Sequence, residues 1–155
     1  KTAAPWDLPH IAGHQPVAEW PGATGWFTSL VPTQAYQFAN SETYVRFDES
    51  VRGCDAFVIQ SHVAPVNEWI MEHLIMVDAL KRGSAKRITV VLPFYGYARQ
   101  DKKHRGREPI SARLMADLYK TAGADRILTM DLHAPAIEGS WLSPLASSLS
   151  APMAT

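Results

Sequence analysis

A single cysteine, Cys54, is present among 155 residues, so no disulfide can form within the chain. No apolar run approaches the roughly 18 residues that a membrane-spanning helix needs, and the first residues lack the basic start and apolar core of a secretory signal peptide. Lys plus Arg and Asp plus Glu number 15 each, so the formal net charge is zero. We therefore expect a cytoplasmic protein, with no membrane partner and no overall charge that attracts nucleic acid.

Two common phosphate-binding sequences, GxxxxGK(S/T) and GxGxxG, are also absent, which excludes a Walker-type loop and a dinucleotide-binding loop. The chain instead has a segment at 99–107, Arg-Gln-Asp-Lys-Lys-His-Arg-Gly-Arg, with five Lys or Arg side chains and one carboxylate. We call this segment the basic loop. Arg can contact two phosphate oxygens at once and Lys acts as a mobile charge, so the segment predicts a polyphosphate site. The alternative is a solvated charged loop.

Strand and helix patterns alternate through the middle of the chain. Apolar, β-branched runs at 56–60, 88–95 and 126–130 predict three strands covered on both faces. Amphipathic patterns at 65–82 and 109–122 predict two helices between them. This order is typical of an α/β fold with a parallel sheet and right-handed crossovers. We expect a three-layer domain with helices on both faces of the sheet.

The flanking regions differ in character from this middle part. Residues 31–33 and 43–47 predict two strands joined by a polar turn at 38–42. Residues 1–29 show no period of either helix or strand, so we expect an irregular segment. Residues 142–155 are mostly Ser, Ala and Pro, which predicts a disordered tail. The α/β domain is therefore expected to extend from residue 30 to residue 141.

Two groups of candidate site residues follow strands of the predicted sheet. Ligands of parallel sheets bind outside the carboxyl ends of the strands. The basic loop follows the second strand, and Asp131 and His133 follow the third, so one site can contain both. A carboxylate and an imidazole two residues apart could hold a divalent cation on ATP phosphates. The alternative is that His133 only caps a loop.

The turn at 38–42 offers another kind of site. Phe38, Asn40 and Glu42 provide a flat ring, an amide and a carboxylate, which are the groups needed to stack on a purine and bond its edge. An ordinary turn is the alternative. Residues 50–53, Ser-Val-Arg-Gly, could seat an anion or simply connect two strands.

Taken in order, these segments resemble ribose-phosphate pyrophosphokinase, also called phosphoribosyl diphosphate synthetase, from about residue 30 to residue 139. The segments that carry the resemblance are Phe-Ala-Asn-Ser-Glu-Thr at 38–43, Glu-Ser-Val-Arg-Gly at 49–53, Tyr-Ala-Arg-Gln-Asp-Lys-Lys at 97–103, Pro-Ile-Ser-Ala at 109–112, and Ala-Gly-Ala-Asp-Arg at 122–126 leading into Asp-Leu-His at 131–133. Lys-His-Arg-Gly-Arg at 103–107 looks like the bacterial form.

The resemblance implies a phosphoribosyltransferase-like α/β domain and transfer of a diphosphoryl group from Mg-ATP to ribose 5-phosphate, giving phosphoribosyl diphosphate and AMP. By position it implies a set of ATP-binding residues, of which the first three reach the adenine from a neighbouring subunit: Phe38, Asn40, Glu42, Arg99, Gln100 and Asp101. It implies that Asp131 and His133 serve the Mg²⁺-triphosphate, with His133 catalytic.

The resemblance also implies regulation and assembly. A regulatory anion site, where phosphate activates and ADP inhibits, would match Ser50, Arg52, Lys103, His104, Arg105 and Arg107. The family forms homo-oligomers built from dimers, with hexamers as the assembled form, and an adenine site shared between subunits requires at least a dimer.

The chain departs from the family at both ends. The family has two similar α/β domains, and the second carries the ribose 5-phosphate loop and a mobile basic catalytic loop that this chain lacks. Residues 1–29 lack the family's first strand and helix, and the sequence after Gly139 differs from the family's. We expect a fragment, a frame-altered product or a natural short form that is inactive by itself. The alternatives are a catalytically silent regulatory member and a nucleic-acid-binding module using the basic loop.

Overall fold

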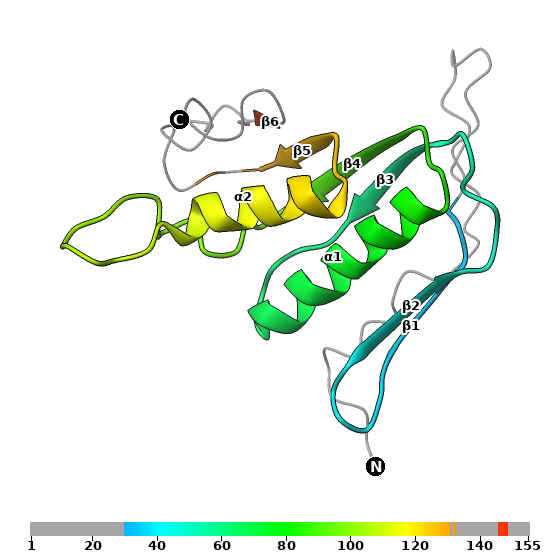
Figure 1. Cartoon of the computed structure of the whole chain (residues 1–155), viewed down its shortest axis with the longest axis horizontal. Coiled ribbons are helices and arrows are strands. Elements are labelled where there is room, and N and C mark those ends of the chain that lie inside the picture. The colour runs from blue at the N-terminus through cyan, green and yellow to red at the C-terminus, as the bar shows by residue number, and fades with distance from the viewer. Residues whose placement is uncertain (1–29, 131, 133–145, 149–155) are drawn as a thin grey trace, which may run out of the picture. The chain divides into compact units, whose positions relative to one another are not determined.

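The computed structural model describes residues 30–130, 132 and 146–148 (Figure 1). The chain divides into two compact units, residues 1–50 and residues 51–155. The described part of the first unit is a two-stranded hairpin. The described part of the second unit is a sheet with two helices.

The hairpin pairs β1 (Thr33–Gln37) with β2 (Thr43–Phe47) in antiparallel register. Its turn is closed by the Phe38 amide, which donates to the Glu42 carbonyl at 2.8 Å. The predicted second strand and the turn at 38–42 are confirmed. The first strand begins later than predicted, at Thr33, because Pro32 has no amide hydrogen to donate and contributes only its carbonyl, 2.9 Å from the Asp48 amide.

The second unit contains the predicted alternation of strands and helices. Its elements in chain order are β3 (Asp55–Ile59), α1 (Val66–Arg82), β4 (Arg87–Leu92), α2 (Ser111–Ala122), β5 (Arg126–Thr129) and β6 (Ala146–Ser148). The four strands form one sheet in the order β3-β4-β5-β6, and every neighbouring pair is parallel. The α/β fold predicted from the sequence is confirmed.

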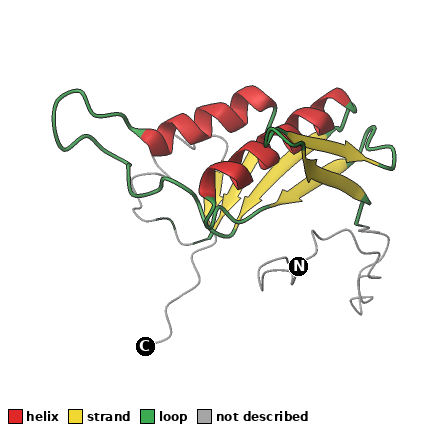
Figure 2. Cartoon of the chain, turned by 90° about the horizontal axis from the view of Figure 1, so that it is seen from below, coloured by secondary structure: helices red, strands yellow, loops and turns green. Residues whose placement is uncertain are grey.

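Both described helices lie on one face of this sheet, where Figure 2 shows them side by side. Val58, Val90 and Ile127 stand in register across three strands and are 8%, 0% and 0% exposed. On the opposite face, Phe57 is 65% and Ile59 61% exposed. Right-handed crossovers that advance in one direction along a sheet place their helices on the same side, as α1 and α2 are here. The expectation of helices on the other face as well is not tested by the described residues.

The buried face of α2 also differs from the leucine pattern. Leu114 and Leu118 stand one turn apart and predict an apolar face turned to the core, yet they are 52% and 37% exposed. The buried positions are Ala112, Met115, Ala116 and Tyr119. Ala112 and Ala116 stand one turn apart on this face and allow close approach, while Met115 and Tyr119 provide its larger buried side chains.

Both helices end at glycines, as the sequence indicates. Gly83 follows α1, whose last turn carries Lys81 and Arg82. Cations at this end of a helix stabilise it by interacting favourably with the helix dipole. Gly123 follows α2 with φ 123°, a conformation that other residues rarely adopt. A Cβ at Gly123 would stand 2.5 Å from the Cδ of Lys81. Both the backbone conformation and the packing at Gly123 therefore determine where α2 ends.

The strand β6 lies inside the segment 142–155, which the sequence predicts to be without regular structure. It runs parallel to β5, with Ser147 opposite Leu128. An Ala-Ser-Ser sequence has no strand pattern of its own, so the pairing comes from the free edge of β5. None of the helices in the described part of the chain has the length and apolar character that crossing a membrane requires.

Candidate functional site

The carboxyl ends of β3, β4 and β5 meet at one edge of the sheet. After β3, the His62 amide donates to the Phe94 carbonyl at 3.1 Å, and after β5 the Met130 amide donates to the Leu92 carbonyl at 3.3 Å. The basic loop leaves this edge after Tyr95. The predicted meeting of strand ends is thus confirmed for the described residues, whereas Asp131 and His133 lie outside them.

The segment that leads into the basic loop is held against α1. The Gly96 amide donates to Nδ1 of His62 at 3.1 Å, and the Tyr97 hydroxyl donates to Oδ1 of Asn67 at 2.6 Å. Tyr97 has a positive φ of 63°. A Cβ at Gly96 would stand 3.0 Å from the Cβ of His62 and 3.1 Å from a methyl of Val66, so the close approach favours glycine.

The start of the basic loop is held in turn by α2. The Ala112 amide, in the first turn of α2, donates to the Gln100 carbonyl at 3.1 Å. The Ser111 hydroxyl donates to Oε1 of Gln100. Arg99 therefore lies between Tyr97, which contacts α1, and Gln100, which contacts α2, while its own side chain is exposed. A fixed backbone with a free guanidinium is suited to binding an anion that arrives from solution.

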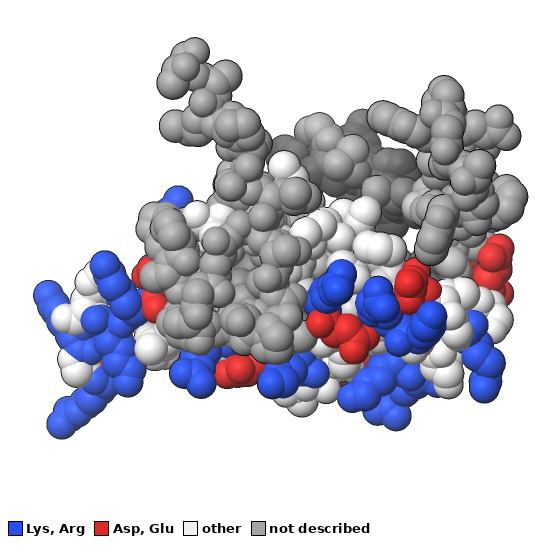
Figure 3. Space-filling view, turned by 90° about the horizontal axis from the view of Figure 1, so that it is seen from above, with Lys and Arg blue, Asp and Glu red and all other residues white. Residues whose placement is uncertain are grey.

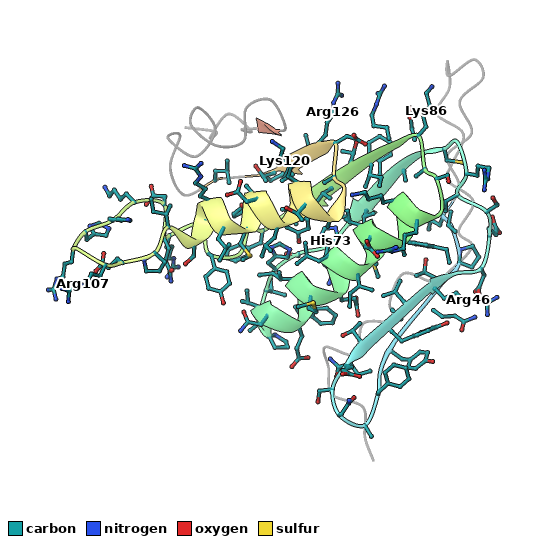
Figure 4. All side chains as sticks on the ribbon, viewed as in Figure 1. Arg46, His73, Lys86, Arg107, Lys120 and Arg126 are labelled. Atoms are coloured by element: carbon teal, nitrogen blue, oxygen red, sulfur yellow. The ribbon has the colours of Figure 1, made fainter. Side chains whose placement is uncertain are left out.

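The rest of the basic loop forms a turn closed by one carboxylate. Glu108 accepts hydrogen bonds from the backbone amides of His104 and Arg105 at 2.8 and 3.0 Å. These bonds, the one from Arg105 first, hold the pKa of Glu108 below its usual range. Arg107 has a φ of 69° and lies at the far end of the loop in Figure 4.

The cations of the basic loop are available to ligands. All of its Lys and Arg side chains are exposed, namely Arg99, Lys102, Lys103, Arg105 and Arg107, and so is His104. Among the described residues, no carboxylate forms an ion pair with a Lys or Arg of the loop. Figure 3 shows one group of Lys and Arg side chains at the left of the view, with others spread over the rest of the described surface. Unpaired cations in one loop create a local positive potential in a chain with no net charge.

The hairpin carries an exposed aromatic cluster at its turn. Phe38 is 48% exposed and makes edge contacts with Tyr36 and Tyr44, with ring centroids 5.5 and 6.0 Å apart. Oδ1 of Asn40 accepts the Glu42 amide at 3.2 Å and so helps to close the turn. The two tyrosines were not among the predicted site residues. They are cross-strand partners, so their side chains lie on the same face of the hairpin.

The predicted regulatory residues do not form one cluster within the second unit. Arg52 lies in a turn before β3, where the Gly53 amide donates to the Ser84 carbonyl at 2.9 Å. This turn is at the amino end of the strands, and residues 103–107 follow their carboxyl end. Ser50 is exposed and belongs to the first unit. Arg52 and the basic loop therefore lie toward opposite ends of the parallel strands.

A buried polar chain behind the loop was missed by the sequence analysis. Nε2 of His62 lies 2.7 Å from the Tyr119 hydroxyl, which lies 3.1 Å from Nδ1 of His73. Nε2 of His73 lies 3.3 Å from the carbonyl of Val58. Figure 4 labels His73 on α1. One signal was in the sequence, since His73 is three residues after Ile70 and four before Val77, on the buried face of α1.

Burial keeps both of these histidines neutral. It lowers the pKa of His62 to about 4. Burial, and then the nearby His62, lower the pKa of His73 to about 3. The pKa of Tyr119 is raised, again mainly by burial. No group of three or more His, Cys, Asp or Glu in the described ranges is arranged to hold a metal ion.

Comparisons with known proteins give a consistent result. A family model described as the N-terminal domain of ribose phosphate pyrophosphokinase matches residues 23–123. A ribose-phosphate pyrophosphokinase of Streptomyces avermitilis is 71% identical over 116 residues, which cover 75% of this chain and 36% of the relative. One of Mycobacterium tuberculosis is 74% identical over 111 residues, which cover 72% of this chain and 34% of the relative.

A solved structure is similar over the same region. The crystal structure of phosphoribosylpyrophosphate synthetase from Mycobacterium smegmatis matches with a TM-score of 0.76 and 67% sequence identity. The match covers 78% of this chain and 40% of that one. The chain thus spans about a third of the length of the curated relatives it matches.

Proposed function

The chain belongs to the ribose-phosphate pyrophosphokinase family, and from this we propose that it supplies the ATP-binding half of a ribose-phosphate diphosphokinase. The proposed reaction transfers a diphosphoryl group from Mg-ATP to ribose 5-phosphate and gives phosphoribosyl diphosphate and AMP. The observation that carries the proposal is the basic loop, whose start is anchored at the carboxyl edge of the sheet and whose cations are free of ion pairs with described carboxylates.

The chemistry of this reaction suits such a loop. Transfer of a phosphoryl-type group depends on positioning and on cations that offset developing charge, with little covalent participation by the protein. We assign the ATP to Arg99, Gln100 and Asp101, with Arg99 beside the adenine. The contacts of Gln100 with α2 support this assignment, because they fix the backbone from which Arg99 extends.

Mg²⁺ is part of the proposal. Asp131 and His133, which lie outside the described residues, would hold the Mg²⁺-triphosphate, with His133 as the catalytic residue. The hydrogen bond from the Met130 amide to β4 supports placing these two residues at the carboxyl edge of the sheet, from which the basic loop also leaves. A carboxylate oxygen is a ligand that Mg²⁺ accepts. Bound Mg²⁺ would offset the charge of the transferred phosphates.

The adenine site and the oligomer belong together in this proposal. Phe38, Asn40 and Glu42 of a neighbouring subunit would contact the adenine, which requires a homo-oligomer built from dimers, up to a hexamer. The exposure of the Phe38 ring supports stacking on a base. A cytoplasmic location completes the proposal.

We propose that phosphate and ADP act as effectors at a separate anion site. Its residues would be Lys103, His104, Arg105 and Arg107 of one subunit, with Ser50 and Arg52 of another. The position of Arg52 at the amino end of the strands supports a site made between copies rather than within one chain. Neither a silent regulatory subunit nor a nucleic-acid-binding module is favoured by any observation on the described residues.

Isothermal titration calorimetry with Mg-ATP tests the nucleotide site. We expect the 155-residue chain to bind Mg-ATP and Arg99→Ala to bind at least about tenfold more weakly, the loss typical of a charged hydrogen bond. Arg126→Ala is the matched control, because this exposed arginine stands at the amino end of β5, away from the basic loop (Figure 4). Equal affinity of the two variants would exclude the assignment of Arg99.

A further inference from the structure

The buried polar chain reaches the backbone just before the basic loop. It begins at the Gly96 amide, three residues before Arg99, and passes through His62, Tyr119 and His73 to the backbone of β3. All three side chains are 0% exposed. The chain therefore links the anchored start of the loop with both helices and with the first strand of the sheet.

The Gly96 amide and the Val58 carbonyl, at the two ends of this series of hydrogen bonds, determine where every proton lies. The Gly96 amide can only donate, so Nδ1 of His62 is its acceptor, and a neutral His62 must carry its proton on Nε2. That proton is donated to the Tyr119 oxygen, and the Tyr119 hydroxyl then donates to Nδ1 of His73. His73 in turn donates from Nε2 to the Val58 carbonyl, which can only accept. No other arrangement of protons satisfies all four contacts.

The arrangement requires both imidazoles to be neutral. Burial lowers the pKa of His62 and of His73 well below neutrality, in agreement with this requirement. If His62 took the other tautomer, its Nδ1 proton would face the Gly96 amide, and two donors would oppose each other. The contact with the loop therefore depends on the tautomer, and the tautomer depends on Tyr119 and His73.

We propose that His62 is a positioning residue for the nucleotide site, and that Tyr119 and His73 fix the tautomer in which His62 holds Gly96. Through Gly96, His62 sets the backbone from which Arg99 and Gln100 extend. The part of this inference that concerns ATP rests on the proposed function. The part that concerns the geometry of the loop does not.

Two substitutions of His62 separate positioning from core stability. His62→Asn places an amide oxygen where Nδ1 stands, so it keeps an acceptor for the Gly96 amide and loses the donor to Tyr119. His62→Gln places an amide nitrogen near the position of Nε2, so it keeps the donor and loses the acceptor. Both remove a buried ring, and both are expected to lower the denaturation midpoint in urea.

Their effects on the loop are expected to differ. In Mg-ATP calorimetry, we expect affinity within about twofold of the original chain for His62→Asn, and about fivefold to tenfold weaker for His62→Gln, the effect of one lost hydrogen bond. Hydrogen exchange of the Gly96 amide should stay slow in the first variant and become fast in the second. Equal losses in both variants, in proportion to their stability, would overturn the proposal.

Tyr119→Phe tests the tautomer directly. This variant keeps the ring and removes only the hydroxyl that joins the two histidines. Nitrogen-15 spectra of the imidazoles should show His62 and His73 protonated on Nε2 in the original chain and His62 as a mixture of tautomers in Tyr119→Phe, with faster exchange of the Gly96 amide. An unchanged tautomer and unchanged exchange would overturn the role of Tyr119.

The two proposals fail in different ways. If the original chain binds no Mg-ATP, the proposed function fails, and the hydrogen exchange of Gly96 still decides whether His62 positions the loop. If Mg-ATP binds and both His62 variants bind as the original chain does, the nucleotide site stands and the positioning role is excluded.

Discussion

His62 and His73 titrate differently in the folded and the unfolded chain. The pKa of an exposed histidine is about 6.5, and burial lowers the pKa of His62 to about 4 and of His73 to about 3. At pH values between the folded and unfolded pKa values, these histidines bind protons in the unfolded chain but not in the folded chain. Stability contributed by the neutral imidazoles is therefore complete above pH 6.5 and is lost as the pH falls toward 4.

Urea unfolding at several pH values measures this loss. Between pH 6.5 and 5, we expect the free energy of unfolding to fall by up to about 1.4 kcal/mol per pH unit for each of the two histidines. The double variant His62→Asn, His73→Leu removes both groups and should show a much smaller slope over this interval. An equal slope in the double variant would show that other groups cause the acid sensitivity.

The end of α2 sets a second constraint, at the scale of one element. Gly123 has a positive φ of 123°, and a Cβ there would contact Lys81 at 2.5 Å. We expect Gly123→Ala to lower the free energy of unfolding in urea by about 1–3 kcal/mol. Gly106→Ala is the control, since a Cβ at Gly106 would meet nothing within 4 Å. Equal stability of the two variants would contradict the role of Gly123.

The order of the elements could be predicted from the sequence because each is encoded locally. The runs around β3, β4 and β5 are apolar and β-branched, and the helices between them end at glycines. The local sequence does not show in the same way which face of a strand is covered by helices. Phe57 and Val58 are both apolar, yet one is exposed and the other buried, because the helix positions decide between them.

The candidate site could be predicted only in part for a similar reason. The place of the basic loop follows from its position after a parallel strand. The hydrogen bond between His62 and Tyr119 joins residues 57 positions apart, and no periodic pattern in the sequence predicts a contact between residues so far apart. The strand β6 was not predictable, because its pairing depends on the edge offered by β5. The roles of Asp131 and His133 stay predictions.

At the scale of the whole molecule, the chain spans about a third of the curated relatives. The resemblance to the family implies that the catalytic loop and the ribose 5-phosphate loop lie in a second domain. We therefore expect no AMP formation above background when the 155-residue chain is mixed with ATP, Mg²⁺ and ribose 5-phosphate in a coupled assay. A full-length relative assayed in parallel is the positive control. Appreciable turnover by this chain would refute the need for the second domain.

The exposed face of β3 has a consequence for how the protein behaves in solution. β3 is the terminal strand of the described sheet, and it presents Phe57 and Ile59 to solvent. Among the described strands, only β4 pairs with it, so its outer edge has no described partner strand. Such an edge accepts a strand from another molecule. Refolding from denaturant is therefore a competition between closing one sheet and joining sheets of different chains. Because only the second process depends on concentration, dilution favours recovery of the native fold.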